Sequence, residues 1–249
     1  MKIFVINLEV SQDRRSFITK QFNKIGVKFE FFNAVDGQNL AQKWKNRCRS
    51  ILHNQLFGNS GFEVDNEIAC FASHYLLWSA CVEANENFII LEDDVCLDEQ
   101  FKHQLPFVEG LVNDLDYLRL MALNQEDEKI ILNQNLVCYL NHPCGTQGYA
   151  ITPSGARRLL AHAETWGEPV DMYLDKYWIH GLRAYCFIPE IIKHSETMPS
   201  LISSMAKRSP KYLPKPRGLV KLTREIVIRP AQQLKRKLFE FRHNLFLQV

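Results

Sequence analysis

The chain has 249 residues, of which 46% are hydrophobic and 23% charged, and its formal net charge is +2. This is the composition of a globular protein that can bury a core, in one large or two small domains. No apolar run approaches the roughly 18 residues that a membrane-spanning helix needs. The apolar stretch in the opening "MKIFVINLEV" is too short for a signal peptide, so we expect the chain to stay in the compartment where it is made.

Seven cysteines are present, which is an odd number, and no two of them form a C-x-x-C pair. Most of them lie in apolar surroundings. This pattern favours reduced core residues in the cytosol over a disulfide framework or a zinc site.

Charge is distributed unevenly along the chain. Residues 207–249 carry 12 Lys and Arg against two Glu, whereas residues 1–206 carry 18 Lys and Arg against 26 Asp and Glu. Pro210, Pro214 and Pro216 interrupt the start of the basic part. We therefore expect a folded domain over residues 1–206 and a basic, partly helical tail over residues 207–249.

The tail mixes cations with large apolar residues, which allows several roles. As a basic amphipathic helix it would lie on an anionic membrane. It could equally pack on its own domain, remain solvated, or bind RNA or a partner protein. The apolar residues expected to face lipid in the first case are Leu234, Leu238, Phe239, Phe241 and Leu245.

The chain opens with a β-α-β pattern. "KIFVINL" (residues 2–8) is a short apolar run typical of a buried strand. The next segment has apolar residues on one helical face and ends at Gly26, and "VKFEFFNAV" (residues 27–35) is a second strand closed by Asp36-Gly37. This opening predicts an α/β fold with a mostly parallel central sheet flanked by helices.

Helical and strand patterns continue to alternate. Residues 38–66 are polar, with one short helix expected around Trp44. A longer helix is expected from Glu67 to Val82, and it leads into the apolar strand "FIIL" at residues 88–91. The later elements expected are strands at 116–123, 136–140, 148–152 and 183–188, a helix beginning at Thr152-Pro153, and a helix from Pro169 to His180.

The strand "FIIL" runs directly into three carboxylates, Glu92, Asp93 and Asp94. Like charges crowded together destabilise a fold unless water, hydrogen bonds or a cation offset them. Open α/β sheets bind ligands at the carboxyl ends of their strands, so Glu92 and Asp94 could share one Mn²⁺ or Mg²⁺ that also holds a substrate diphosphate. The alternative is a solvated acidic turn.

Three further residues could complete such a site, and each has a simpler alternative. His194, just after a late strand, could be a metal ligand or a surface residue. His74, on the helix before the acidic strand, could contact a donor phosphate or sugar, or it could pack in the core. Asp36 could bind a ribose or begin a turn.

"WGEPVDMYLDKYW" places Glu168 and Asp171 at a helix start beside aromatic residues. Acids in this position often serve only the helix dipole. However, aromatic rings stack on sugars, and a carboxylate there could take the proton from an attacking hydroxyl. This pattern indicates the acceptor site of a sugar transferase, with Asp171 as the candidate base.

Six motifs occur in an order that resembles glycosyltransferase family 25, the bacterial lipooligosaccharide galactosyltransferases and their relatives. Together they extend over most of residues 1–206. The motifs are "INLEVSQDRR" (6–15), "FNAVDG" (32–37), "EIACFASHYLLW" (67–78), "IILEDDV" (89–95), "TQGYAITPSGARRLL" (146–160) and "EPVDMYL" (168–174).

The resemblance implies a GT-A-like catalytic domain over residues 1–206. It implies transfer of a hexose, most simply galactose from UDP-galactose, with inversion onto a lipooligosaccharide sugar, as a β-1,4-galactosyltransferase. "EDD" then acts as the metal and nucleotide motif, with Glu92 where the motif has Asp, and Asp94 as the best single choice for the ion. The residues expected to bind substrate are Asn7, Arg15, Asp36, His74, Glu92, Asp93 and Gln147; those expected to hold Mn²⁺ or Mg²⁺ are Asp94, Glu92 and His194; those expected in catalysis are Asp171 and Glu168.

These expectations describe a cytoplasmic bacterial enzyme that docks on the inner face of the inner membrane through its basic tail, with no nucleic-acid partner. Within the same family the donor could instead be UDP-glucose. From other classes, the chain could be a metal-dependent phosphoester hydrolase whose tail binds nucleic acid, or a non-enzymatic nucleotide-sugar-binding module. Two-metal hydrolysis needs carboxylates for a pair of ions, and the sequence contains one such cluster.

Overall fold

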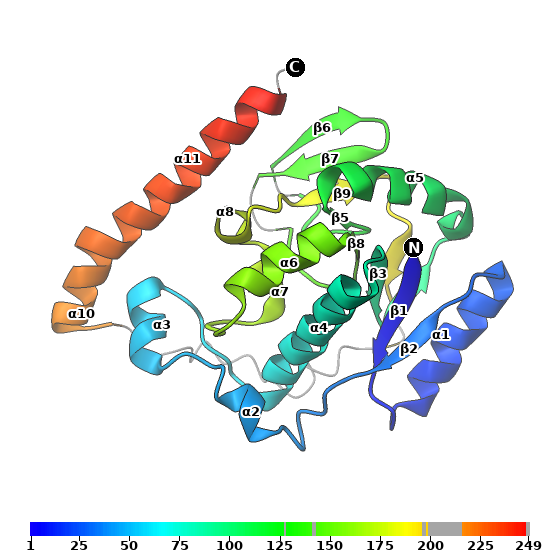
Figure 1. The fold of residues 1–249 in the computed structure, drawn as a ribbon, viewed down its shortest axis with the longest axis horizontal. Coiled ribbons are helices and arrows are strands. Elements are labelled where there is room, and N and C mark those ends of the chain that lie inside the picture. The colour runs from blue at the N-terminus through cyan, green and yellow to red at the C-terminus, as the bar shows by residue number, and fades with distance from the viewer. Residues whose placement is uncertain (127, 141–142, 196–197, 199–215, 248–249) are drawn as a thin grey trace.

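The computed structural model describes residues 1–126, 128–140, 143–195, 198 and 216–247. In this part of the chain the centre is an eight-stranded sheet with helices on both faces (Figure 1). The strand order is β2-β1-β3-β8-β5-β9-β7-β6. The strands are β1 (Lys2–Asn7), β2 (Glu30–Asn33), β3 (Phe88–Glu92), β5 (Tyr117–Arg119), β6 (Lys129–Asn133), β7 (Leu136–Tyr139), β8 (Gly148–Ile151) and β9 (Tyr185–Phe187).

The direction of the strands confirms the predicted class. β1 pairs in parallel with β2 and β3, and β5 pairs in parallel with β9. β8 and β7 run antiparallel to the strands beside them. Six of the eight strands therefore share one direction, which makes the fold an α/β fold with a mostly parallel, though mixed, central sheet.

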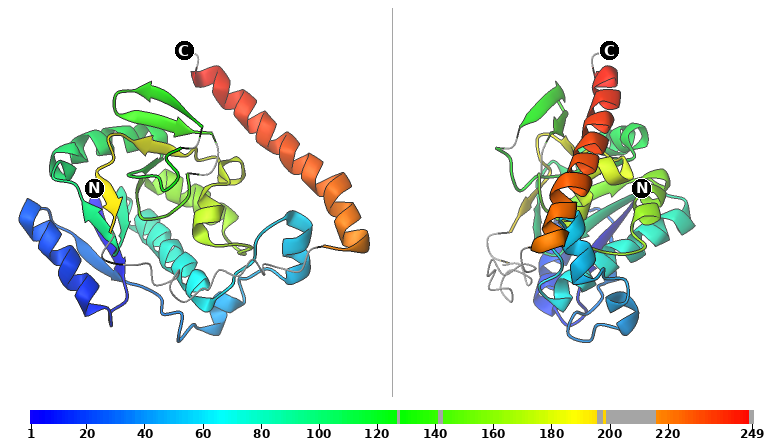
Figure 2. Two further views of the ribbon diagram at one scale, coloured as in Figure 1. Left: turned by 180° about the vertical axis from the view of Figure 1, so that it is seen from behind. Right: turned by 90° about the vertical axis from the view of Figure 1, so that its left-hand side faces the viewer.

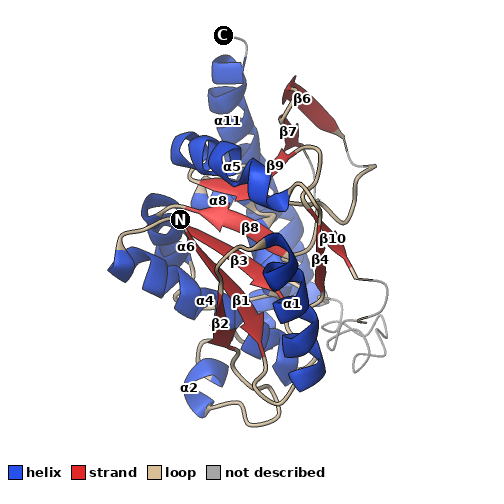
Figure 3. Ribbon diagram, turned by 90° about the vertical axis from the view of Figure 1, so that its right-hand side faces the viewer, coloured by secondary structure: helices blue, strands red, loops and turns tan. Residues whose placement is uncertain are grey.

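Helices cover both faces of this sheet (Figure 3). The helices of the domain are α1 (Gln12–Ile25), α2 (Gln42–Lys45), α3 (Ile51–Phe57), α4 (Asp65–Ala84), α5 (Phe101–Leu115), α6 (Pro153–His162), α7 (Val170–Leu174) and α8 (Tyr177–His180). Alternate strand residues point to opposite faces. Accordingly, Val5 and Ile89 pack in the core with α1 and α5, whereas Phe4 and Ile90 pack with α4 and α6. Burial from both sides explains why these strands are continuous apolar runs in the sequence.

Most predicted elements are confirmed, with two differences in the helices. The segment 38–66 contains two short helices, because α3 follows the expected one around Trp44. The single helix expected from Pro169 to His180 is wrong, since α7 and α8 are separate helices. Lys176 leaves the helical conformation between them, with φ −87° and ψ 56°. Its ammonium group donates to Glu168 at 2.7 Å, a contact that helical periodicity alone does not reveal.

Several elements have weak sequence signals and were not predicted. α5 contains Pro106 and Gly110, two residue types that are unfavourable inside helices. β6 is an edge strand whose Ile130 and Ile131 are both exposed, so it lacks the alternation of a half-buried strand. Packing of α5 against the sheet therefore overrides its local propensity.

The basic tail is helical over all its described residues from Gly218 onward. α10 (Gly218–Thr223), a π-helical stretch (Arg224–Ile228) and α11 (Arg229–Leu247) follow one another without a break. They lie along one side of the domain, beside α3 and α8 (Figure 2). Gln232 Nε2 donates to the Phe57 carbonyl at 3.1 Å. The predicted boundary at residue 206 lies outside the described residues.

None of the helices in the described ranges is both long enough and apolar enough to cross a lipid bilayer.

Candidate functional site

The carboxyl ends of β1, β2 and β3 meet at one edge of the sheet. The strand register pairs Asn7 with Asn33 and Ile6 with Glu92, so the acidic cluster lies beside the ends of the two neighbouring strands. β8 is antiparallel and pairs Gly148 with Leu91, which brings its first residues to the same edge. A cavity of about 110 Å³ lies there, and its lining includes Asn7, Arg14, Cys70, Ser73, Glu92, Asp93 and Asp94.

Asp93 is held inside the protein by two side chains of the N-terminal β-α unit. Arg14 on α1 donates to its Oδ1, and Asn7 Nδ2 donates to its Oδ2 at 2.7 Å. Burial raises the pKa of Asp93, although these two donors favour its ionised form. Because both oxygens already accept hydrogen bonds, Asp93 anchors the acidic segment and has less capacity for a ligand than its neighbours.

Glu92 is approached by groups from three other elements. The Thr146 hydroxyl donates to its Oε1, and His74 Nε2 lies 3.7 Å from the same oxygen, beyond hydrogen-bond length. Burial opposes ionisation of Glu92, but His74, Thr146 and His194 outweigh this effect and lower its pKa. These groups therefore favour the ionised form of Glu92.

Asp94 is buried, and within the described part of the chain one of its carboxylate oxygens lacks the side-chain hydrogen bonds that Asp93 and Glu92 accept. Its residue surface is 4% exposed, and its Oδ1 has no hydrogen-bond partner among the described residues. Burial, followed by the charges of Glu92 and Asp93, raises the pKa of Asp94 to about 7. A buried charge of this kind is costly unless a cation pairs with it. The oxygen donors of Asp94 and Glu92 fit Mn²⁺ or Mg²⁺, both of which prefer carboxylate ligands.

The predicted metal ligand His194 is brought to this cluster by a small second sheet. β4 (Val95–Leu97) and β10 (Ile192–His194) are antiparallel, and His194 pairs with Val95. The next backbone N–H, of Ser195, donates to the Asp94 carbonyl at 2.8 Å. The His194 ring is exposed and close enough to Glu92 to help lower its pKa.

Gln147, which was predicted to bind substrate, also lies beside the acidic cluster. Its carbonyl accepts the Glu92 N–H at 2.9 Å, immediately before β8 begins. Its side chain is partly exposed. Its position is therefore compatible with contact to a ligand in the cavity.

Asp171 lies on α7, and its charge acts on Cys70, a residue that lines the cavity. Burial, and then the charges of Glu92, Asp171 and Asp94, raise the pKa of the Cys70 thiol. Cys70 is thus within electrostatic reach of Asp171 on one element and of the acidic cluster on another. Since Asp171 is only partly buried, its carboxylate remains accessible to an incoming molecule.

Glu168, the second carboxylate predicted from this segment, is engaged within the protein. It is 5% exposed, and Lys176 Nζ lies 2.6 Å from Oε1 and 2.7 Å from Oε2. Burial raises its pKa, although the charge of Lys176 acts in the opposite direction. This ion pair joins the segment just before α7 to the two-residue connection between α7 and α8.

Asp36 and Arg15 make local contacts next to the cavity. Asp36 Oδ1 accepts the Gln38 N–H at 2.9 Å, as in the Asp-Gly turn that was its simpler alternative. Arg15 donates to Asn7 Oδ1 and to Asn33 Oδ1, both at 2.8 Å. It therefore ties together the carboxyl ends of β1 and β2.

Arg14, Thr146 and Cys70 were not predicted as site residues. Arg14 precedes the buried Ile18 by four residues, so helical phase places it on the inner face of α1 and distinguishes it from Arg15. Cys70 lies four residues before His74 on α4, which also puts these two on one face. Thr146 has no local signal, because its contact depends on the pairing of β8 with β3.

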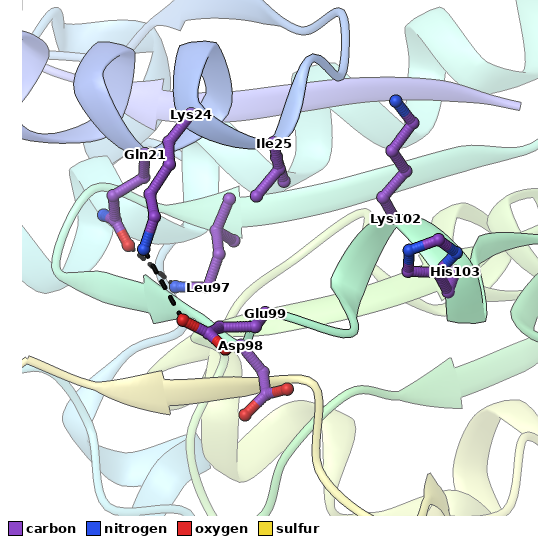
Figure 4. Close-up of a pocket in the computed structure, with 8 residues that line it drawn as sticks. All are labelled: Gln21, Lys24, Ile25, Leu97, Asp98, Glu99, Lys102 and His103. Carbon is purple, nitrogen blue, oxygen red and sulfur yellow. Dashed lines mark hydrogen bonds and ion pairs between the residues drawn. The ribbon is translucent and has the colours of Figure 1, made fainter.

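A larger cavity of about 450 Å³ lies between α1, β4 and the start of α5 (Figure 4). Gln21 accepts the Leu97 N–H at 2.8 Å and donates to a β4 carbonyl, and Lys24 lies 3.6 Å from Glu99. These contacts join α1 to β4. None of the eight residues that line this cavity, all of them described, has a buried polar atom without a partner, so the smaller cavity is the better candidate.

The mostly parallel central sheet with helices on both faces is a GT-A-like α/β fold. The family description "Glycosyltransferase family 25 (LPS biosynthesis protein)" matches residues 1–174. The chain belongs to glycosyltransferase family 25, as its six ordered motifs indicate.

Relatives of the chain occur in animals and bacteria. It is 32% identical over 184 residues to a "Glycosyltransferase 25 family member" of Aedes aegypti, 28% identical over 172 residues to "Lipooligosaccharide biosynthesis protein lic2B" of Haemophilus influenzae, and 29% identical over 195 residues to "Procollagen galactosyltransferase 1-B" of Xenopus laevis. These matches cover 69%, 64% and 70% of this chain but 30%, 62% and 30% of the relatives. The chain therefore spans less than two thirds of the length of each of them.

Asp94→Asn is expected to stabilise the metal-free protein at high pH. The pKa of Asp94 is raised from 3.8 to about 7 by folding, so the folded state holds this proton more tightly, and Asp94 costs stability as the pH rises through that window. The gain in the free energy of unfolding on substitution should be larger at pH 8 than at pH 5, by on the order of 1–3 kcal/mol. Urea denaturation in EDTA at the two pH values measures it.

Glu99→Gln removes an exposed carboxylate from the same region and serves as the control. Its effect on stability should be nearly the same at both pH values. An equal effect of Asp94→Asn at pH 5 and pH 8 would contradict the raised pKa.

Proposed function

We propose that the protein transfers a hexose from a UDP-sugar, most simply galactose from UDP-galactose, with inversion onto a lipooligosaccharide sugar, as a β-1,4-galactosyltransferase. Glycosyl transfer follows from membership of family 25. The buried, unpartnered oxygen of Asp94 supports a metal-assisted reaction with a diphosphate donor. It favours a cation at the edge of the sheet where such a donor would bind. Two relatives, a procollagen galactosyltransferase and a lipooligosaccharide biosynthesis protein, support the choice of galactose and of a lipooligosaccharide acceptor.

Asp94 and Glu92, together with His194, are the residues that would hold Mn²⁺ or Mg²⁺. When bound, such an ion neutralises the negative charge that develops on a diphosphate leaving group. Asp93 helps to position Glu92 and Asp94, because Arg14 and Asn7 hydrogen-bond to it and so fix the segment that contains all three carboxylates.

Asp171 is the proposed general base. It would take the proton from the acceptor hydroxyl, whose oxygen forms the bond to the anomeric carbon of the hexose. The bond from that carbon to the diphosphate breaks, and the departing nucleotide takes the electron pair. Attack and departure on opposite faces invert the configuration. Glu168 is less suited to this role, since Lys176 already binds both of its oxygens.

The alternatives differ in how well the observations support them. A UDP-glucose donor would use the same carboxylates and the same base. Family membership favours glycosyl transfer over phosphoester hydrolysis and over binding without turnover. A two-metal hydrolase also needs a second set of carboxylates beside the first, whereas Asp93 is engaged by Arg14.

The tail is proposed to dock the enzyme on an anionic membrane, at the inner face of the bacterial inner membrane. One face of α11 packs on the domain, where Glu240 accepts the Tyr177 hydroxyl at 2.8 Å. Away from that contact, Leu234, Leu238 and Phe241 are 60%, 51% and 66% exposed and recur at helical spacing. Exposed Lys residues at positions 235 and 237 lie among them, a combination that suits anionic headgroups and lipid.

Asp94→Ala is expected to abolish metal-dependent transfer. Loss of the central oxygen ligand should lower turnover by about 100-fold or more, because charge on the leaving group is no longer offset. UDP release from UDP-galactose, measured with a lipooligosaccharide acceptor and Mn²⁺, provides the rate. Glu99→Ala, which removes an exposed carboxylate nearby, should retain the wild-type rate.

Wild-type turnover in Asp94→Ala would exclude the proposed metal role. Asp171→Asn gives an independent comparison, since a base on the acceptor side should lower kcat while leaving the affinity for UDP-galactose nearly unchanged. Retained kcat in that variant would assign the base to another residue.

Membrane docking is tested by flotation with vesicles. The wild-type chain should float with phosphatidylethanolamine–phosphatidylglycerol vesicles but not with phosphatidylcholine vesicles. The triple variant Leu234→Ser, Leu238→Ser and Phe241→Ser should lose this binding. Val10→Ser with Ile131→Ser replaces residues that are 85% and 71% exposed on the domain and should not affect it. Equal flotation of the triple variant and the wild type would contradict docking through α11.

A further inference from the structure

Cys70, His74 and Glu92 gather their side-chain ligand atoms in one place. Cys70 and His74 are four residues apart on α4 and therefore share a helix face, and Glu92 faces them from the end of β3. The Cys70 sulfur, a ring nitrogen of His74 and a carboxylate oxygen of Glu92 all lie within 4.8 Å of one another. A thiol, an imidazole and a carboxylate at this separation are a characteristic metal-ligand set.

The His74 ring supplies an independent reason to expect a ligand. Its residue surface is 0% exposed, and its Nδ1 is 2.8 Å from the Tyr149 hydroxyl. Its Nε2 is buried, has no hydrogen-bond partner among the described residues, and lies 3.7 Å from Glu92 Oε1. A buried nitrogen without a partner is unfavourable, and an ion bound between His74, Cys70 and Glu92 would remove this cost.

The separation of the nitrogen and oxygen ligand atoms is close to that of a tetrahedral metal site. Bonds of about 2.0–2.1 Å to nitrogen and oxygen place two ligand atoms of a tetrahedral site roughly 3.3–3.4 Å apart. The Nε2–Oε1 distance of 3.7 Å is close to this value and too long for a direct hydrogen bond. Three protein ligands leave the fourth position open to water or to another molecule.

The surroundings of His74 also match those of a metal-binding histidine. Such a residue usually donates its second ring N–H to a fixed acceptor, and the Tyr149 oxygen can accept from His74 Nδ1. Trp78 Nε1 donates to the same oxygen at 2.8 Å and so holds the tyrosine in place. Cys70 and Glu92 line the cavity of the candidate active site, which provides a route for an ion.

We propose that Cys70, His74 and Glu92 form a site for Zn²⁺ that is distinct from the Asp94 and His194 positions of the hard-cation site. Thiolate and imidazole ligands favour Zn²⁺ and Co²⁺, whereas carboxylate oxygens suit Mn²⁺ and Mg²⁺. Glu92 belongs to both ligand sets, so Zn²⁺ bound here withdraws a carboxylate from the other ion. If the proposed function is accepted, this competition makes Zn²⁺ an inhibitor of transfer.

The test is titration of the metal-free chain with Co²⁺, followed by absorption spectroscopy. A cobalt–thiolate bond gives a near-ultraviolet charge-transfer band, and tetrahedral Co²⁺ gives visible bands, so neither readout depends on activity. Wild type should show both sets of bands, and added Zn²⁺ should remove them. Cys70→Ser should lose the charge-transfer band, and His74→Gln should weaken binding of Co²⁺ at least tenfold. Circular dichroism establishes that each variant is folded.

Two control variants establish whether the bands arise from this site. Cys48→Ser changes a partly buried cysteine elsewhere in the chain and should keep the bands. Asp94→Asn should also keep them, because Asp94 belongs to the other ligand set. Absence of bands in wild type, their survival in folded Cys70→Ser, or their loss in Asp94→Asn would each overturn the proposal.

The inhibition assay adds a separate readout. Zn²⁺ should lower Mn²⁺-dependent UDP release by wild type several-fold at a concentration that saturates the cobalt-defined site. It should have little effect on Cys70→Ser relative to the uninhibited rate of that variant. Failure to detect any UDP release would count against the proposed function alone, since the cobalt spectra decide the metal site without it.

Discussion

The repulsion among three adjacent carboxylates in a desolvated edge of the sheet is the constraint on which the rest of the structure depends. Arg14 and Asn7 compensate Asp93, and the Thr146 hydroxyl, from the loop before β8, donates to Glu92. Among the described residues Asp94 Oδ1 has no hydrogen-bond partner, and the charge of Arg14 does not outweigh the effect of burial on its pKa. Folding alone does not favour this arrangement, because a buried unpaired charge weakens the native state. The same feature that lowers stability thus provides the strongest attraction for a cation.

Sheet topology explains how distant segments meet at this point. The parallel trio β2-β1-β3 brings the N-terminal unit to the acidic segment, and antiparallel β8 delivers Thr146 and Gln147 to the same edge. β10 pairs with β4, which directly follows the acidic cluster, so His194 lies beside that cluster. Asp171, on α7, lies within electrostatic reach of Cys70, which lines the cavity. Strand pairing and helix packing, rather than local sequence, determine the position of each of these residues.

The sequence predicted what depends on local pattern. Doubly buried strands are continuous apolar runs, and a charge cluster directly after one is visible without a structure, so the β1-α1-β2 opening and the position of Glu92 and Asp94 could be predicted. It did not predict α5, whose Pro106 and Gly110 obscure the helical pattern. Nor could composition show that Glu168 is engaged by Lys176, or that Cys70 and His74 converge on Glu92, since these depend on tertiary contacts.

Asp94 is proposed to hold a divalent ion that binds a uridine diphosphate sugar. Thermal unfolding of the chain with UDP-, GDP- and CMP-sugars, each with Mn²⁺ and with EDTA, tests it most directly, because a ligand of the folded state raises the unfolding temperature. UDP-hexoses should stabilise the wild type only when Mn²⁺ is present and should have little effect on Asp94→Ala. Stabilisation by a CMP-sugar in EDTA, or equal stabilisation of Asp94→Ala by UDP-galactose, would contradict the account.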